Sequence, residues 1–167
     1  MKTKTLLATL VATLIFSAGT ISAQTPQQYT GGPGIVISGS ENYNSLPKDA
    51  QNFVKKHFKN LSVVKCEKYF AKGKYEIELS DDIDIEFDSK GKVMEIDAPD
   101  GKCLPAAVVK DLIHGKAYKR LEKDGFATMV ESIDFDRRGK AVEVEINMPE
   151  PDVYVFDIDG NFIALGD

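Results

Sequence analysis

The chain has 167 residues, with 21 Lys and Arg against 26 Asp and Glu, and its formal net charge at pH 7 is −5. An acidic chain of this kind does not suit binding to nucleic acid or to anionic membrane surfaces, because both require a basic surface. The length is sufficient for one compact domain or for two small units that share a core.

The first 23 residues have the pattern of a cleavable export signal. Lys2 and Lys4 precede a short apolar core at 6–16, and Ala23 is a small residue at the expected cleavage site. The apolar core is too short for a spanning helix, which needs about 20 residues. We therefore expect export to the periplasm or, alternatively, secretion, with no membrane insertion of the mature chain. Loss of Lys2 and Lys4 changes the net charge to −7.

A polar segment and an amphipathic helix follow the signal. Residues 24–45 are rich in Gln, Gly, Ser, Thr and Asn, which predicts a flexible tether. Leu46-Pro47 then opens a helix, since proline suits the first helical position. The apolar stripe of this helix has helical spacing and consists of Ala50, Phe53, Val54, His57 and Phe58.

Period-two alternation after this helix predicts strands with one buried and one solvated face. A strand at 63–70 leads into a doubled hairpin at 74–97, in which apolar and acidic residues alternate. Gly91 supplies the positive φ that its short turn needs. The second half repeats this order, with helical pieces at 104–113 and 117–123 and strands at 126–135, 141–146, 153–156 and 161–165.

The recurrence of motifs indicates a duplicated unit. Leu46-Pro47 recurs as Leu104-Pro105, and the turn Phe-Asp-x-x-Gly at 87–91 recurs at 156–160. We predict an α+β fold made of two tandem units, at 46–98 and 99–167, that form one compact domain. Each unit has a helical region followed by a four-stranded antiparallel sheet, and the helices cover one sheet face.

The ordered set of motifs resembles the PepSY-like family of β-lactamase-inhibitor-like periplasmic proteins. The set comprises the signal peptide, Leu-Pro with the helix containing Phe-Val-Lys-Lys-His-Phe (53–58), Tyr-Glu-Ile-Glu-Leu (75–79) and Phe-Asp-x-x-Gly (87–91). The resemblance covers 46–167 and implies a helix-backed antiparallel sheet whose open face can grip a partner. It implies a shape and not an activity.

The open sheet face is the first candidate site. Acidic side chains should point to it from both units, beside two valines, so a partner with a basic or mixed surface would fit. The alternative is a solvated face that keeps the protein soluble and discourages edge pairing. The predicted face consists of Glu76, Glu78, Asp84, Glu86, Glu143, Glu145, Val153 and Val155.

Calcium and a disulfide are further candidates. Asp157 and Asp159 lie in a turn that resembles part of a calcium loop, although the closing ligands are missing and Asp-Gly is also an ordinary hairpin turn. Cys66 and Cys103 could be bonded in an oxidising compartment, or could be two buried, unpaired thiols.

No set of residues predicts catalysis. His57 and His114 lie on predicted helices, and the serines lack a nucleophile-elbow context. We expect a non-catalytic periplasmic module that binds an unidentified protein or peptide and requires no cofactor. The alternative is a calcium-binding or calcium-regulated structural protein.

Overall fold

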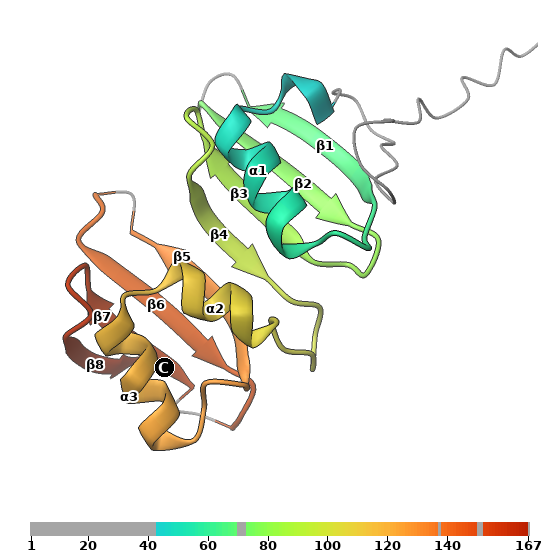
Figure 1. The fold of residues 1–167 in the computed structure, drawn as a ribbon. Helices are drawn as coiled ribbons and strands as arrows, with labels where there is room; N and C mark the ends of the chain where they lie inside the picture. The colour runs from blue at the N-terminus through green and yellow to red at the C-terminus, as the bar shows by residue number, and fades with distance from the viewer. Residues whose placement is uncertain (1–42, 70–72, 137, 150–151, 167) are drawn as a thin grey trace, which may run out of the picture.

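The structure is a computed structural model that describes residues 43–166 except 70–72, 137 and 150–151 (Figure 1). The predicted signal peptide and residues 24–42 of the predicted tether lie outside the described residues. The elements in chain order are η1 (Tyr43–Ser45), α1 (Lys48–His57), β1 (Val63–Tyr69), β2 (Lys74–Leu79), β3 (Asp84–Asp88), β4 (Val93–Asp97), α2 (Ala106–Leu112), α3 (Gly115–Asp124), β5 (Val130–Phe135), β6 (Ala141–Ile146), β7 (Val153–Asp157) and β8 (Phe162–Gly166).

The strands form one eight-stranded sheet in the order β1 to β8, and every neighbouring pair is antiparallel. The three α-helices lie against the same face of this sheet (Figure 1). The mixed α/β class with an antiparallel sheet is therefore confirmed. None of the described helices is long and apolar enough to cross a bilayer.

Alternation in the sequence decides which side chains enter the core. In β2, Tyr75, Ile77 and Leu79 are buried under the helices, while the intervening Glu76 and Glu78 lie on the opposite face. The same alternation buries one side chain in two along β3, β6 and β7. One continuous apolar core thus lies between the sheet and the helices, and none of the described helices lies over the opposite face of the sheet (Figure 1).

Two sets of contacts join β1–β4 to β5–β8. On the sheet, β4 pairs with β5 through three residue pairs, with Ile96 opposite Ile133 at the centre. Among the helices, a carboxylate oxygen of Asp111 in α2 lies 2.7 Å from Lys56 Nζ and 2.8 Å from His57 Nε2 in α1. His57 is nearly buried, with 6% of its side chain exposed, so this ion pair connects the helical layers of the two halves.

Two hairpin turns pack directly against helix starts. A Cβ built on Gly91 would lie 2.6 Å from the backbone nitrogen of Ala50 in α1. A Cβ built on Gly160 would lie 3.0 Å from the backbone nitrogen of Ala117 in α3. The β3–β4 turn therefore rests on α1 as the β7–β8 turn rests on α3. The helix that directly follows Leu104-Pro105 is α2, so the β7–β8 turn packs on the second helix after that motif.

Three sequence-based boundaries need correction. Tyr43–Ser45 were assigned to the tether but form η1, because the Tyr43 side chain is fully buried and its hydroxyl donates to the Gln51 carbonyl at 3.0 Å. The strand predicted from residue 126 begins at Val130. The helical piece predicted at 117–123 begins earlier, at Gly115, and the His114 side chain accepts a hydrogen bond from Lys116 N at this end of α3.

We predict that Gly91→Ala lowers the free energy of unfolding by about 2–4 kcal/mol, because the new methyl group meets Ala50 and also strains a backbone at φ +92°. Chemical denaturation of the purified protein measures this change. Gly139→Ala is the matched control, since its φ is +64° but no atom lies within 4 Å of the added Cβ; it should cost about 1 kcal/mol. Equal losses in the two variants would contradict the packing role of Gly91.

Candidate functional site

The uncovered face carries a row of carboxylates that runs across six neighbouring strands. The pairing register places one acidic side chain of each strand, from β1 to β6, directly opposite the next, and then continues into Val155 of β7 and Ala164 of β8. Neighbouring strands are about 4.8 Å apart, so the carboxylates are closely spaced. This acidic row consists of Glu67, Glu76, Glu86, Glu95, Asp134 and Glu143.

A second row lies beside the acidic row on the same face. It begins at Lys65, ends at Val153 and Gly166, and is acidic on four of the strands between them. The structure thus places all eight residues of the predicted face on the uncovered side of the sheet. The intervening members of this second row are Glu78, Asp84, Asp97, Ser132 and Glu145.

Lysines balance only one end of the face. Lys65 Nζ lies 3.3 Å from Glu76 and 3.5 Å from Glu67, and Lys74 forms an ion pair with Glu86. These contacts lie on β1, β2 and β3. The salt bridges among the described residues therefore leave the centre of the face, around Glu95 of β4, surrounded mainly by other carboxylates.

The crowding changes proton affinity at this centre. Burial, followed by the negative charges of Asp97, Glu86 and Asp134, raises the pKa of Glu95 to about 7, while Lys74 acts in the opposite direction. Burial and the neighbouring Asp84 raise the pKa of Asp97 above its usual range. The face is therefore only partly charged near neutral pH, and a positive partner would favour its full ionisation.

We predict that Glu95→Gln raises the free energy of unfolding at pH 8 by about 1 kcal/mol. Between the ordinary pKa of a glutamate and about 7, the folded state holds a proton on Glu95 that the unfolded chain has lost, so stability falls as pH rises through this window. Melting temperatures at pH 5 and pH 8 measure the effect, and the variant should have the smaller difference.

The matched control is Glu143→Gln, at the exposed end of the acidic row next to Val155. It should leave the pH dependence almost unchanged. An equal effect in both variants would mean that the position of Glu95 among its neighbours does not matter.

The sequence analysis does not predict four acidic residues that lie on this face: Glu67, Glu95, Asp97 and Asp134. The alternation that would have found them is interrupted by irregular pairing in β1 before Lys65, between β3 and β4 opposite Glu86 and Phe87, and in β5 before Ser132. In β4 it survives only as Ile96 between two carboxylates, and in β5 as Asp134 between Ile133 and Phe135. The alternation of apolar and acidic residues in β4 and β5 is therefore present in the sequence but extends over few residues.

Asp88 and Asp157 accept hydrogen bonds from other residues of the hairpin turns in which they lie. Asp157 accepts hydrogen bonds at 2.8 Å from both the backbone N–H and the side-chain amide of Asn161, which lowers its pKa. Asp88 accepts from the backbone of Lys90 and Lys92 in the matching turn. In the parts of the chain that the structure describes, no three His, Cys, Asp or Glu side chains are grouped to hold a metal ion. The calcium site at Asp157 and Asp159 stays a prediction.

The structure corrects the disulfide alternative. Cys66 is buried in β1 and Cys103 is exposed, and neither forms a disulfide. Cys103 lies within 3.9 Å of the side-chain amide of Asn147, which follows β6. Since β1 and β6 are five strand spacings apart, or about 24 Å, the two sulfurs cannot meet. The alternative of two buried thiols agrees with the structure for Cys66 but is wrong for Cys103, which is exposed.

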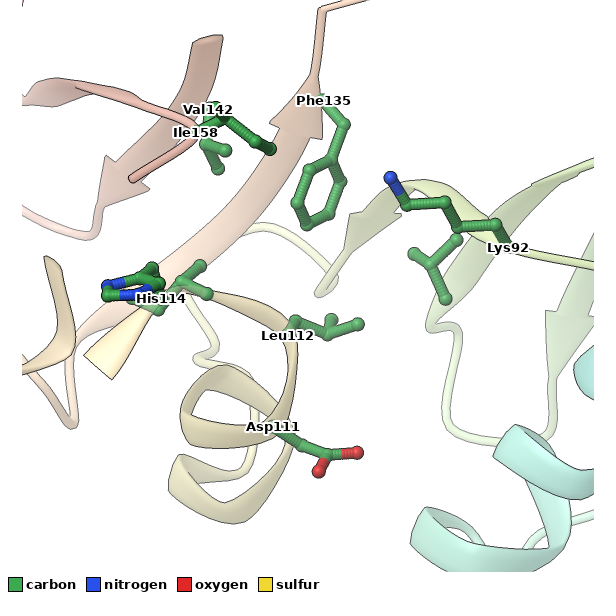
Figure 2. A pocket seen from close by; sticks show the side chains of 9 residues that line it. Lys92, Asp111, Leu112, His114, Phe135, Val142 and Ile158 are labelled. Carbon is green, nitrogen blue, oxygen red and sulfur yellow. The ribbon is translucent and has the colours of Figure 1, made fainter. Parts of the chain in front are cut away.

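A shallow pocket of about 440 Å³ lies on the helix side, between α2 and the β4–β5 joint (Figure 2). Its wall is mostly apolar, including Leu112, Phe135 and Ile158, while Lys92, Asp111 and His114 provide the polar groups. Asp111 is already engaged by α1, and Lys92 Nζ lies 5.7 Å from the centre of the Phe135 ring. Its polar groups do not converge on one point, so the uncovered sheet face is the stronger candidate site.

Residues 40–95 match the model of the family described as "Putative beta-lactamase-inhibitor-like, PepSY-like". The chain carries a PepSY-like region. The predicted family is thereby confirmed on the helix and hairpins that carry its motifs. The PepSY-like region contains α1 and β1–β3 and extends into β4. No curated protein matches the chain in sequence.

Solved structures resemble the PepSY-like region together with the second half. One is a "putative periplasmic protein of unknown function" from Bacteroides vulgatus, with 28% sequence identity and a TM-score of 0.58. The match covers 77% of this chain and 97% of the B. vulgatus chain. A second B. vulgatus protein, described as a "putative periplasmic protein" of the DUF2874 family, is 25% identical with a TM-score of 0.57, covering 76% of this chain and 94% of its own. A "putative calcium-regulated periplasmic protein" from Bacteroides thetaiotaomicron is 24% identical, with the same TM-score and coverage, and shows likeness of fold.

Proposed function

We propose that the chain is a non-catalytic periplasmic binding module that holds a protein or peptide with a basic or mixed surface on its uncovered sheet face. The observation that carries the proposal is the acidic row, which crosses six strands without a covering helix and ends at Val155 and Ala164. Complementary charge would speed encounter and orient the partner, while the apolar end of the row would add contact area.

The charge state of the face supports a role in binding rather than in solubility alone. A surface kept acidic for solubility gains nothing from placing Glu95 where burial, and then the charges of Asp97, Glu86 and Asp134, raise its pKa to about 7. This placement costs folding free energy, and a cationic partner would offset the cost by stabilising the ionised groups. Natural proteins often retain this kind of local cost at sites of function.

We also propose that β1–β4 and β5–β8, with α1 and α3, are two copies of one unit. The strand pairs have bulges at matching places, opposite Glu86 and Phe87 in β3 and opposite Val155 and Phe156 in β7. The contact of Gly91 with α1 has its counterpart in the contact of Gly160 with α3. A duplicated unit of this shape accords with the β-lactamase-inhibitor-like form that the family description names.

The periplasmic address belongs to the proposal. It is supported by the export-signal pattern at 1–23 and by the descriptions of the similar structures as periplasmic proteins.

We predict that Glu143→Lys/Glu145→Lys abolishes capture of the partner, because both side chains are exposed on the uncovered face and the two changes reverse its charge on β6. The immobilised protein would be exposed to periplasmic extract of the native host, and bound proteins identified by mass spectrometry. Asp100→Lys/Glu122→Lys is the matched control, with the same change in net charge at exposed positions in a loop and in α3.

A partner that the wild type and the control capture, and that the β6 variant loses, supports the proposal. Equal capture by the β6 variant and the wild type would remove this face from consideration. Loss in both variants would show that only net charge matters, which contradicts a defined binding face.

Calcium regulation is the second proposal, and it rests on the turn aspartates Asp157 and Asp159. If it is correct, millimolar calcium raises the melting temperature relative to chelator, and Asp159→Asn removes the increase. A melting temperature that is the same in calcium and in chelator would exclude it.

A further inference from the structure

The last hairpin exposes apolar side chains at one edge of the sheet. Within the described residues, the large hydrophobic side chains that are exposed are Ile158, Phe162, Ile163 and Leu165, with exposed fractions of 38% to 57%. Three of them belong to β8, which contains no charged residue and pairs with β7 alone in this sheet. β8 is the last strand at one end of the sheet (Figure 1). Among the described residues it therefore offers an edge without a neighbouring strand, together with apolar side chains.

The equivalent edge in the first half is covered. Residue for residue, the β3–β4 ladder matches the β7–β8 ladder, so that Ile96 of β4 corresponds to Leu165 of β8. Ile96 lies between Ile85 and Ile133 and is fully buried, whereas Leu165 has Tyr154 on one side only and is 48% exposed. Within one copy of the chain, β4 has an antiparallel strand, β5, along its outer edge, and β8 has no such strand in the sheet.

The opposite edge of the sheet differs in kind. Along β1, Lys65, Glu67 and Lys68 provide charge to an edge strand, which is how natural sheets discourage pairing. Pairing β8 with β1 of another copy would set these charges against apolar side chains. It would also leave a free edge at each end, so that copies would add without limit.

Pairing of β8 with itself avoids both costs. An antiparallel pair related by a two-fold axis is closed and places apolar residues of one copy against those of the other. Phe162 and Leu165 lie on the helix side of the edge, and Ala164 and Gly166 lie on the uncovered side. Each copy thus contributes large side chains to one face and small ones to the other.

The charge pattern permits this association. Between the acidic residues of β6 and the edge, the uncovered face carries Val153, Val155, Ala164 and Gly166. In the paired form Glu143 of one copy would lie five strand spacings, about 24 Å, from Glu143 of the other. This separation is about three Debye lengths at physiological ionic strength, so the two acidic fields scarcely repel.

We propose that β8 binds β8 of a second copy in antiparallel orientation, forming a two-fold dimer with one continuous sheet. The apolar end of each acidic row then lies at the centre of the dimer, and the two acidic fields lie on either side. The occupant of this edge is a second copy because a strand without charge suits an identical strand, while any basic partner suits the acidic field. The inference stands independently of the proposed function.

Sedimentation equilibrium of the purified protein over a concentration series tests the proposal. The wild type should behave as a concentration-dependent dimer. Ile163→Lys and Leu165→Lys should each weaken dimerisation by about 100-fold or more, because the two-fold axis buries the added charge twice. Both positions are largely exposed in one copy, so the melting temperature at low concentration should change little.

The matched control is Ala107→Lys, which adds the same charge at an exposed position of α2 and should leave the dimer intact. A second measurement needs no variant: hydrogen exchange at the β8 amides should slow as concentration rises, and exchange in β1 should not change. A wild type that stays monomeric, or a dimer that the β8 variants leave unaffected, would overturn the proposal. A ladder of growing oligomers would overturn the two-fold form and indicate pairing of β8 with β1.

Discussion

The pairing of β4 with β5 is the contact on which the rest of the structure depends. Without it, each half is a four-stranded sheet with one face to cover and a small core. With it, the apolar faces become continuous, Ile96 meets Ile133, and the helical layers are brought close enough for Asp111 to reach Lys56 and His57. The joint is thus secured on the helix side by apolar burial and by an ion pair.

On the other side of the sheet the same joint is under electrostatic strain. Glu95 lies opposite Asp134, and Asp97 lies two residues further along β4. Like charges directly across two strands are destabilising. Burial is the main cause of the raised pKa of Glu95, and the charges of Asp97, Glu86 and Asp134 add to it. The joint between the halves therefore has a cost on this face that rises as Glu95 ionises.

Most of the fold could be predicted because the strands alternate clearly and the turns contain glycine. The doubled hairpin at 74–97 is apolar at every second position on β2 and β3, and that alone decides which face is buried. The helix pairing could not be predicted. Leu46-Pro47 and Leu104-Pro105 look alike locally, yet Gly91 packs on α1, the first helix after its motif, and Gly160 packs on the start of α3, the second helix after its motif.

The candidate site was predicted in part, for a related reason. The side chains of β2, β3 and β6 could be assigned to a face from their own strands, but Glu95 and Asp97 follow a bulge, and Asp134 lies in a short strand flanked by irregular backbone. The crowding of charge arises from the register between strands. Register depends on the folded ladder and is not visible in one strand at a time. The free edge at β8 is likewise a property of strand order.

The strand order has a consequence for how the molecule forms. Every strand pairs with the strand that precedes or follows it along the chain, and within each half only a turn or short loop separates the partners. The exception is the pair of β4 with β5, which closes over residues 98–129 and so carries the largest loss of loop-closure entropy. Each half of the sheet can therefore form from its own hairpins before the joint between β4 and β5 is made.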